Sequence, residues 1–362
     1  MENLVDAEHF SLQKFWANKK VFITGNTGFK GSWLTLWLTH LGATVQGLSL
    51  PDNGDQRLFR LAKIDEFHET FYGDIRDYEF LEDKVLSFKP DVVLHLAAQP
   101  LVRQSYADPL ETFSTNLMGT ANILNVVRVC GSVKVGVIVT TDKVYKNREW
   151  EWAYRENDTL GGHDPYSASK AASELIVDSY RSSYFEQSGV NVSTVRAGNV
   201  IGGGDWSSDR LLPDAMKAWF EKSAALEIRS PSSRRPWQHV LDPLNGYLKL
   251  AMNMWDDPSL SGAFNFGPCW EEPVRVIDVI TQAQVALGRG EVNVLADSGR
   301  LHEAGLLSLD SSKSISRIGW KSKYSQRDAI TRTVDWYRDF YLQKANAREL
   351  CEHDLRCFEG II

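Results

Sequence analysis

Short apolar segments alternate with longer amphipathic segments over the first half of this chain. Apolar stretches rich in β-branched residues predict strands at 21–24, 44–48, 92–96, 135–140 and 192–197. Apolar positions with helical periodicity predict helices between them at 32–41, 78–88, 109–130 and 167–188. Because strands that alternate with helices form right-handed βαβ units, the pattern predicts an α/β protein with a parallel sheet covered on both faces.

This regularity weakens after residue 200, where a Gly-Gly-Gly-Asp-Trp loop occupies 202–206. We expect a larger domain at 18–200 and a smaller, discontinuous domain within 201–340. A short strand at 264–267 should return to the main sheet, so segments near 240–267 and the C-terminal helices would complete the first domain. The segment 324–346 predicts a packed helix, with apolar residues at helical spacing: Ile330, Val334, Trp336, Tyr337 and Tyr341.

Composition and charge narrow the class of protein. The 362 residues carry a formal net charge of −7, which argues against a general binder of nucleic acid or anionic membranes. The basic segment 229–235 is short, and it suits either one phosphate-bearing ligand or a solvated loop. The four cysteines lack metal-ligand spacing, so we expect reduced thiols and no metal site. With no apolar run of about 20 residues and no signal-peptide pattern at the start, we expect a cytoplasmic protein.

Three glycines at three-residue spacing follow the first predicted strand. Gly25, Gly28 and Gly31 let the backbone turn tightly, and the helix that follows offers free N–H groups and a positive dipole end. Such a turn can cradle a pyrophosphate, although a tight strand-to-helix turn without a ligand has the same pattern.

A Tyr and a Lys lie four residues apart at the start of the helix predicted at 167–188. Helix geometry places Tyr166 and Lys170 on one face, one turn apart. The ammonium, together with an oxidised nicotinamide ring, would lower the pKa of the tyrosine so that it can accept a proton from a substrate hydroxyl. Such a pair alone could be a surface pair. Downstream of a glycine turn, and of Thr141 and Asp142 at a strand end, it indicates catalysis.

Seven motifs in this order resemble the extended short-chain dehydrogenase/reductases that act on nucleotide sugars. They occupy 24–31, 73–77, 95–99, 116–120, 140–145, 166–170 and 196–200, and the resemblance extends over about 18–340. The Thr-Asp-Lys triplet at 141–143, the glycine turn and the 202–206 loop are most similar to the CDP-glucose 4,6-dehydratases. The resemblance implies a Rossmann-type doubly wound parallel sheet with a smaller, mixed C-terminal substrate-binding domain, and a place in deoxysugar synthesis for lipopolysaccharide O-antigen.

The same resemblance implies NAD as the cofactor. Residues matching the family's cofactor site are Gly25, Thr27, Gly28, Phe29, Lys30, Gly31, Ser49, Asp74, Ile75, Ala97, Ala98, Asn116, Tyr166 and Lys170. Asp74 and Ile75 would lie at the adenine edge, and Asp74 could also cap a helix. The second strand ends in Ser49 instead of the acidic residue that binds a ribose, and this departure leaves NADP as an alternative.

For the reaction, the resemblance implies oxidation at C4 of the sugar, loss of water across C5 and C6, and return of the hydride to C6. Tyr166 would take the 4-hydroxyl proton, Thr141 would bind the same oxygen, and Lys170 would tune the phenol. Asp142 would protonate the leaving hydroxyl. Lys143 replaces the Glu of related TDP-sugar enzymes, and it could remove the C5 proton or stabilise an enolate.

The resemblance also implies CDP-glucose as the substrate, held by Gln99, Arg103, Asn199, Arg235, Arg300 and His302. A homodimer or homotetramer is expected, because 109–130 and 167–188 resemble the helices that pair family members, with Ile123, Val127, Ile176 and Tyr180 on the outer faces. Two alternatives remain: a nucleotide-sugar 4-epimerase or reductase, and a non-catalytic NAD-binding regulator.

Overall fold

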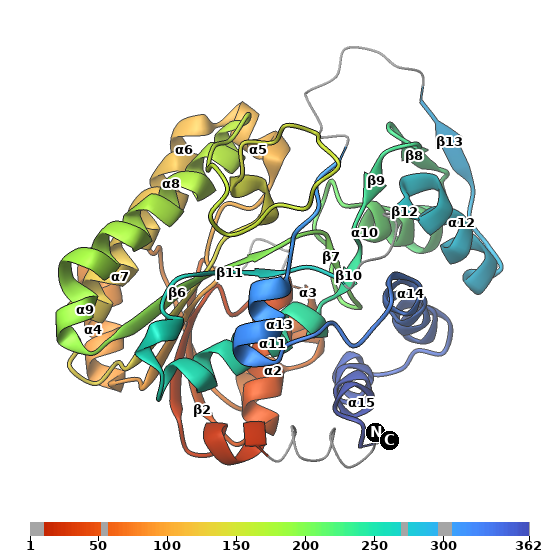
Figure 1. Ribbon diagram of the computed structural model, residues 1–362. Helices are drawn as coiled ribbons and strands as arrows, with labels where there is room; N and C mark the ends of the chain where they lie inside the picture. The colour runs from red at the N-terminus through yellow and green to blue at the C-terminus, as the bar shows by residue number, and fades with distance from the viewer. Residues whose placement is uncertain (1–10, 52–56, 269–273, 296–305, 362) are drawn as a thin grey trace.

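The computed structural model describes residues 11–51, 57–268, 274–295 and 306–361, and its centre is a seven-stranded sheet (Figure 1). All neighbouring strands are parallel, in the order β11-β6-β5-β4-β1-β2-β3. The strands are β1 (Lys20–Thr24), β2 (Thr44–Ser49), β3 (Glu69–Tyr72), β4 (Val92–His95), β5 (Val135–Val139), β6 (Asn191–Ala197) and β11 (Ala263–Phe266). The predicted α/β fold is therefore confirmed, including the return of the 264–267 strand to the sheet.

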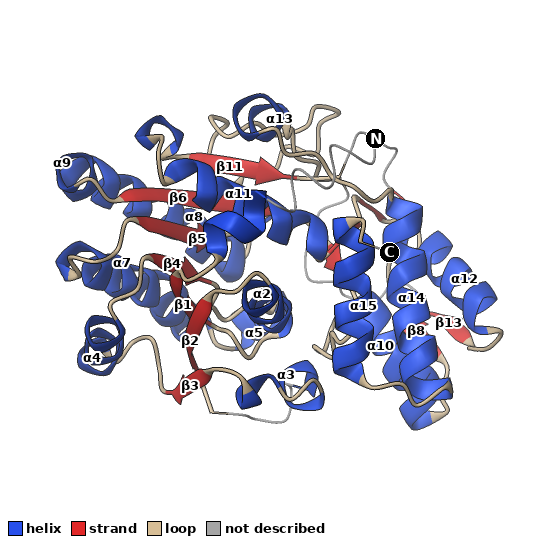
Figure 2. Ribbon diagram, turned by 90° about the horizontal axis from the view of Figure 1, so that it is seen from below, coloured by secondary structure: helices blue, strands red, loops and turns tan. Residues whose placement is uncertain are grey.

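Helices cover both faces of the sheet, as Figure 2 shows from below. One apolar cluster joins one face of the sheet to α4 (Tyr78–Phe88), α7 (Gly119–Val129) and α8 (Pro165–Tyr180). A larger cluster joins the other face to α2 (Phe29–His40) and α11 (Leu241–Met254). Burial on both faces explains why the central strand β5 is apolar at every position that has a side chain.

Two of the predicted helices are each interrupted by a π turn. The segment 109–130 consists of α6 (Pro109–Phe113), η2 (Ser114–Met118) and α7, and 167–188 consists of α8, η4 (Arg181–Phe185) and α9 (Glu186–Ser188). The assignment of their outer faces was wrong: Ile123 and Val127 are fully buried against the sheet, and Ile176 and Tyr180 pack on the same cluster. The exposed apolar side chains of these segments are instead Leu110, Met118, Val129, Leu175 and Tyr184.

Smaller elements build the region beside the sheet, seen to the right in Figure 1. It contains three two-stranded pairs: β7 (Val200–Ile201) with β10 (Gln238–His239), β8 (Leu226–Ile228) with β13 (Val292–Val294), and β9 (Arg234–Arg235) with β12 (Val274–Arg275). Its helical elements are α10 (Leu211–Met216), η5 (Lys217–Lys222) and α12 (Val276–Leu287). The remaining short elements of the fold are α3 (Arg57–Leu61), η1 (Ile64–Glu66), α5 (Val102–Ala107), η3 (Asp142–Val144), η6 (Pro258–Leu260) and α13 (Ser312–Ile318).

The C-terminal helices α14 (Gln326–Leu342) and α15 (Ala347–Glu359) connect the two regions. A Cβ at Gly203 would lie 2.0 Å from the Trp336 ring. Because glycine has no side chain, the 202–206 loop can lie directly on α14. Glu359 of α15 accepts a hydrogen bond from Trp37 of α2 at 2.7 Å and pairs with His40 at 3.3 Å. Among the described residues, none of the helices combines the length and hydropathy that a membrane crossing requires.

Candidate active site

The glycine turn is packed so closely that a side chain would not fit at Gly25 or Gly31. A Cβ at Gly31 would lie 2.1 Å from the carbonyl oxygen of Gly25, and one at Gly25 would lie 2.7 Å from the backbone nitrogen of Ala97. Gly28 is the exposed N-cap of α2, and it offers no side chain to the first-turn N–H groups. Those N–H groups have no partner within the helix, so they are available to an anion at its positive end.

Ser49, at the end of β2, stabilises this turn through two hydrogen bonds. The Ser49 hydroxyl donates to the side chain of Asn26 at 2.9 Å and accepts from the backbone N–H of Thr27 at 3.2 Å. Asn26 is fully buried and also donates to Thr70 at 2.8 Å, so it ties the turn to β3. The Ser49 hydroxyl is thus engaged in shaping the turn, and this contact explains why a small hydroxyl residue ends β2.

Asp74 and Ile75 follow β3 at the carboxyl edge of the sheet. Asp74 binds the Arg76 guanidinium, whose hydrogen bond lowers the pKa of the carboxyl, and Arg76 also pairs with Glu111. The helix cap considered for Asp74 is supplied by Asp77 instead, which accepts from the N–H of Phe80. Ile75 is nearly buried, and a Cβ at Gly119 would lie 2.3 Å from its side chain.

Asn116 joins the loop after β4 to helix α8. Its side chain exchanges two hydrogen bonds with the backbone of Gln99 and donates to Ser169 at 2.8 Å. Ala97 and Ala98 begin this loop, and both are partly buried. Gln99 is not among the described residues that line the cavity described below. Its amide binds Leu101 and Thr112 and so holds the loop, and its contact with substrate stays a prediction.

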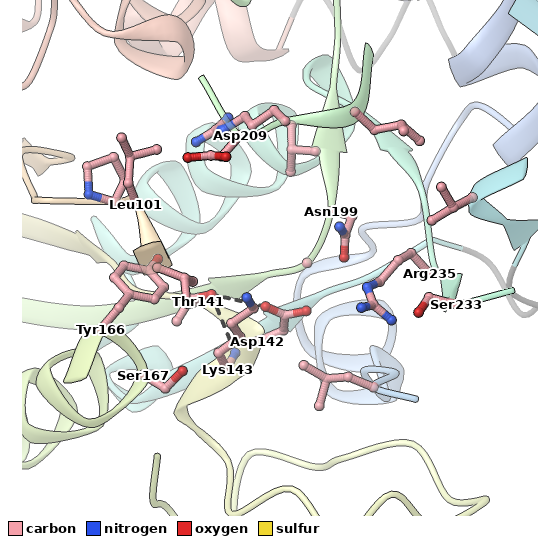
Figure 3. Close-up of a pocket in the computed structure, with 18 of the residues that line it drawn as sticks. Leu101, Thr141, Asp142, Lys143, Tyr166, Ser167, Asn199, Asp209, Ser233 and Arg235 are labelled. Carbon is pink, nitrogen blue, oxygen red and sulfur yellow. Dashed lines mark hydrogen bonds between the residues drawn. The ribbon is translucent and has the colours of Figure 1, made fainter. Parts of the chain in front are cut away.

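A cavity of about 1760 Å³ opens at the carboxyl end of the sheet, where the predicted catalytic residues meet (Figure 3). Thr141 caps η3 directly after β5, and Asp142 and Lys143 follow it. Tyr166 comes from the first turn of α8, which Pro165 and the Asp164 N-cap start. Of the five predicted catalytic residues, these four line the cavity, whereas Lys170 is buried and is not one of the lining residues. The volume of the cavity exceeds the 300–1,000 Å³ usual for a single small ligand.

Burial controls the acidity of Tyr166 and Lys170, the predicted catalytic pair. It raises the pKa of Tyr166 to about 12, although a hydrogen bond with Thr141 opposes this rise. Lys170 is buried, which lowers its pKa to about 8, and its ammonium donates to the carbonyl of Val139 at 3.0 Å. The expectation that Lys170 lowers the pKa of Tyr166 is therefore not met in the protein alone, because the desolvation of the phenol dominates.

Asp142 is held as a buried carboxyl, 5% exposed. Burial raises its pKa, while Lys143, the Thr141 hydroxyl and Arg235 act in the opposite direction. Thr141 donates to its Oδ1 at 3.0 Å, and a Cβ at Gly198 would lie 3.0 Å from its Oδ2. Gly198 thus leaves room for this carboxyl.

The cavity is basic although the chain is acidic overall. Among the described residues, seven Lys or Arg residues and four Asp residues line the cavity. The basic residues are Lys30, Arg103, Lys143, Lys146, Arg210, Arg229 and Arg235. Asn199 and Arg235 face the cavity from the wall opposite Tyr166 (Figure 3). Arg103 also lines it and pairs with Asp209 at 3.3 Å. The predicted substrate residues Arg300 and His302 lie outside the described residues.

Sequence reasoning missed several supports of this site. Arg210 lines the cavity and pairs with Asp205 at 2.9 Å, and only its place after the glycine loop could have suggested it. Glu174, one turn beyond Lys170, binds Arg196 of β6 and the hydroxyl of Thr140. This buried network fixes α8 against the strand ends that carry the catalytic residues.

Comparisons with known proteins agree with this geometry. The family model described as GDP-mannose 4,6-dehydratase matches residues 22–333. The CDP-glucose 4,6-dehydratase of Salmonella typhimurium is 45% identical over 333 residues, covering 90% of this chain and 92% of that protein. The chain therefore belongs to the GDP-mannose 4,6-dehydratase family.

Two solved structures are similar to this chain over nearly their whole length. A dTDP-glucose 4,6-dehydratase from Streptomyces venezuelae with NAD and TYD bound has a TM-score of 0.76 at 25% identity, covering 88% of this chain and 97% of that one. The UDP-glucose 4-epimerase of Thermus thermophilus with NAD has a TM-score of 0.75 at 25% identity, covering 88% of this chain and 99% of that one. Dehydratases and epimerases thus share this fold, so the site must distinguish the two reactions.

Proposed function

We propose that this protein is an NAD-dependent hydro-lyase that converts CDP-glucose to CDP-4-keto-6-deoxyglucose. The observation that carries the proposal is the placement of Asp142 beside Thr141 and Tyr166 in one cavity. The CDP-glucose 4,6-dehydratase at 45% identity supports the same activity and substrate. A 4-epimerase needs no acid for a leaving hydroxyl, so a buried carboxyl with a raised pKa favours the dehydratase.

The glycine turn fits NAD. We propose that the N–H groups of the α2 first turn bind the pyrophosphate, which the exposed Gly28, having no side chain, lets approach. The absence of side chains at Gly25 and Gly31 lets the turn close tightly on its own backbone and on Ala97. Asp74 would accept from the adenine amine while Arg76 holds its carboxylate in place. When bound, NAD supplies the acceptor for the hydride of C4 and returns that hydride to C6.

Tyr166 would accept the proton of the sugar 4-hydroxyl, and Thr141 would hold the same oxygen. Because the pKa of Tyr166 is about 12 in the protein alone, the positive charge of the oxidised cofactor is needed to favour the phenolate. Lys170 holds its place through Val139 and adds a second positive charge on the same helix face. The phenol therefore becomes a competent base only after NAD has bound.

Asp142 would protonate the departing 6-hydroxyl. Lys143 lines the same cavity with an exposed side chain, and it would either take the C5 proton or stabilise the enolate that forms. Arg235, Asn199 and Arg103 would hold the diphosphate and the nucleoside, because guanidinium groups bind phosphate oxygens in pairs.

We further propose that two copies associate through the outer face of α6–α9. Leu110, Met118, Leu175 and Tyr184 leave this face apolar, with exposed fractions of 79%, 52%, 62% and 47%. Apolar side chains in this number on one helical layer suit a symmetric interface with a second copy.

Mass spectrometry of CDP-glucose after incubation with the protein and NAD tests the proposed function. We expect a product lighter by one water, and no such product from the Tyr166→Phe variant. A product of unchanged mass would assign the protein to the epimerases. Parallel incubations with GDP-mannose, dTDP-glucose and UDP-glucose test the nucleotide, and turnover should be fastest with CDP-glucose.

A further inference from the structure

A second lysine, from the glycine turn, reaches the catalytic cavity. Lys30 is the second residue of α2, and its side chain lines the cavity with Thr141 and Asp142. It makes no hydrogen bond or ion pair with any residue in the described part of the chain. The family resemblance implies a place for Lys30 in the cofactor site, and the structure adds that the residue lines the cavity that holds Tyr166.

The surroundings of Lys30 disfavour its charged form. Burial lowers its pKa to about 8, and the positive charges of Arg210 and Lys170 act in the same direction, against the opposite effect of Asp142 and Asp205. An aliphatic side chain could fill this position without desolvating an ammonium. An ammonium without a hydrogen-bond or ion-pair partner among the described residues, in a cavity large enough for ligands, is placed to act on a bound group.

The chemistry of the site indicates that the nicotinamide ring of the cofactor would lie near Lys30. Hydride transfer requires the nicotinamide and the sugar carbon in contact, and the sugar hydroxyl is held at Tyr166 and Thr141. Among the charges that act on Lys30 are those of Asp142 and Arg210, and both of these residues line the same cavity as Tyr166 and Thr141. The nicotinamide ring carries a positive charge when oxidised and none when reduced. A neighbouring ammonium therefore opposes the oxidised ring and favours the reduced one.

We propose that Lys30 makes the bound cofactor a stronger oxidant, and that it thereby drives the oxidation of C4. This inference rests on the proposed function in so far as NAD is the cofactor. Lys30 acts on the cofactor through its charge and takes no proton or hydride itself. The same charge slows the return of the hydride, so elimination of water must make that return favourable.

The ratio of two binding constants tests the proposal without any turnover. The Kd for NAD and the Kd for NADH are measured at about pH 7, by titration of the cofactor-free protein, for the wild type, Lys30→Met and Lys30→Arg. The ratio of the Kd for NAD to that for NADH should fall about 10-fold in Lys30→Met, which corresponds to about 1.4 kcal/mol. Lys30→Arg keeps the charge and should stay within about twofold of the wild type.

Two results would overturn the proposal. An unchanged ratio in Lys30→Met, with both cofactors still bound, would show that the charge does not act on the ring. Equal weakening of both cofactors would show that Lys30 only contributes to binding. The proposed function fails separately: a protein that binds NAD with the expected ratio but forms no dehydrated product would retain this inference and lose the assigned reaction.

Discussion

Replacement of Asp142 by Asn should separate oxidation from elimination. The amide has the size of the carboxyl, so it fits beside Gly198 and can still accept the hydrogen bond that Thr141 donates at 3.0 Å. It cannot donate a proton to the leaving hydroxyl. General acid catalysis contributes about 10²- to 10⁴-fold, so elimination should be slower by that factor, or by about 3–5 kcal/mol in barrier height.

The absorbance of reduced nicotinamide provides the assay. On mixing with NAD and CDP-glucose, Asp142→Asn should accumulate bound NADH, because Asp142 takes no part in hydride transfer from C4, in which Tyr166 and Thr141 act on the sugar hydroxyl. The wild type should show little NADH and form the deoxy product. Asp209→Asn is the matched control, since this aspartate lines the same cavity at a partly exposed position and should leave elimination within about threefold of the wild type.

Two outcomes would refute this reasoning. If Asp142→Asn binds CDP-glucose with unchanged affinity but never forms NADH, Asp142 acts in the oxidation step. If it forms the deoxy product at the wild-type rate, another group protonates the hydroxyl.

Three further predictions concern the base, the assembly and the stability of the fold. Tyr166→Phe should fold normally and lose about 10²- to 10⁴-fold in turnover, and a near-normal rate at neutral pH would exclude Tyr166 as the base. Leu175→Glu should yield monomers in sedimentation, whereas Leu86→Glu on α4, also partly exposed, should not; an unchanged dimer in both would exclude the proposed face. Glu359 raises the pKa of His40 above 6.5, so the stability from this pair is present below that pH and is lost as the pH rises through the folded-state pKa. Glu359→Gln should therefore unfold more easily than the wild type at about pH 5.5, by less than about 1 kcal/mol, and the difference should shrink at about pH 8, as measured by denaturant titration.

The spacing of apolar residues was sufficient to predict the strands and helices that have one strongly apolar face. The predicted strands and the helices of the sheet region agree with the structure to within a few residues, because each has an apolar face that must be buried. β3 was missed because it is a four-residue strand at the edge of the sheet with no buried position. α15 was missed because its position depends on Trp37 and His40, more than 300 residues away in the sequence.

Motif spacing brought the catalytic residues together but could not give their environments. Tyr166 and Lys170 are four residues apart in any helix, whereas the pKa of the phenol depends on burial by the whole fold. The apolar residues of α7 cover more than one face, so the sequence alone could not tell that Ile123 faces the sheet. Lys30 could be assigned to the turn, but only the fold shows that it lines the same cavity as Arg210, which is 180 residues away in the sequence.

Deuterium at C4 of CDP-glucose tests the central claim most directly. A 4,6-dehydratase that holds its cofactor through all three steps must move the label from C4 to C6 of the same sugar. The account predicts a product that has lost one water and carries deuterium at C6, located by mass spectrometry and NMR. A sugar of unchanged mass with deuterium still at C4, or a dehydrated product without label at C6, would contradict it.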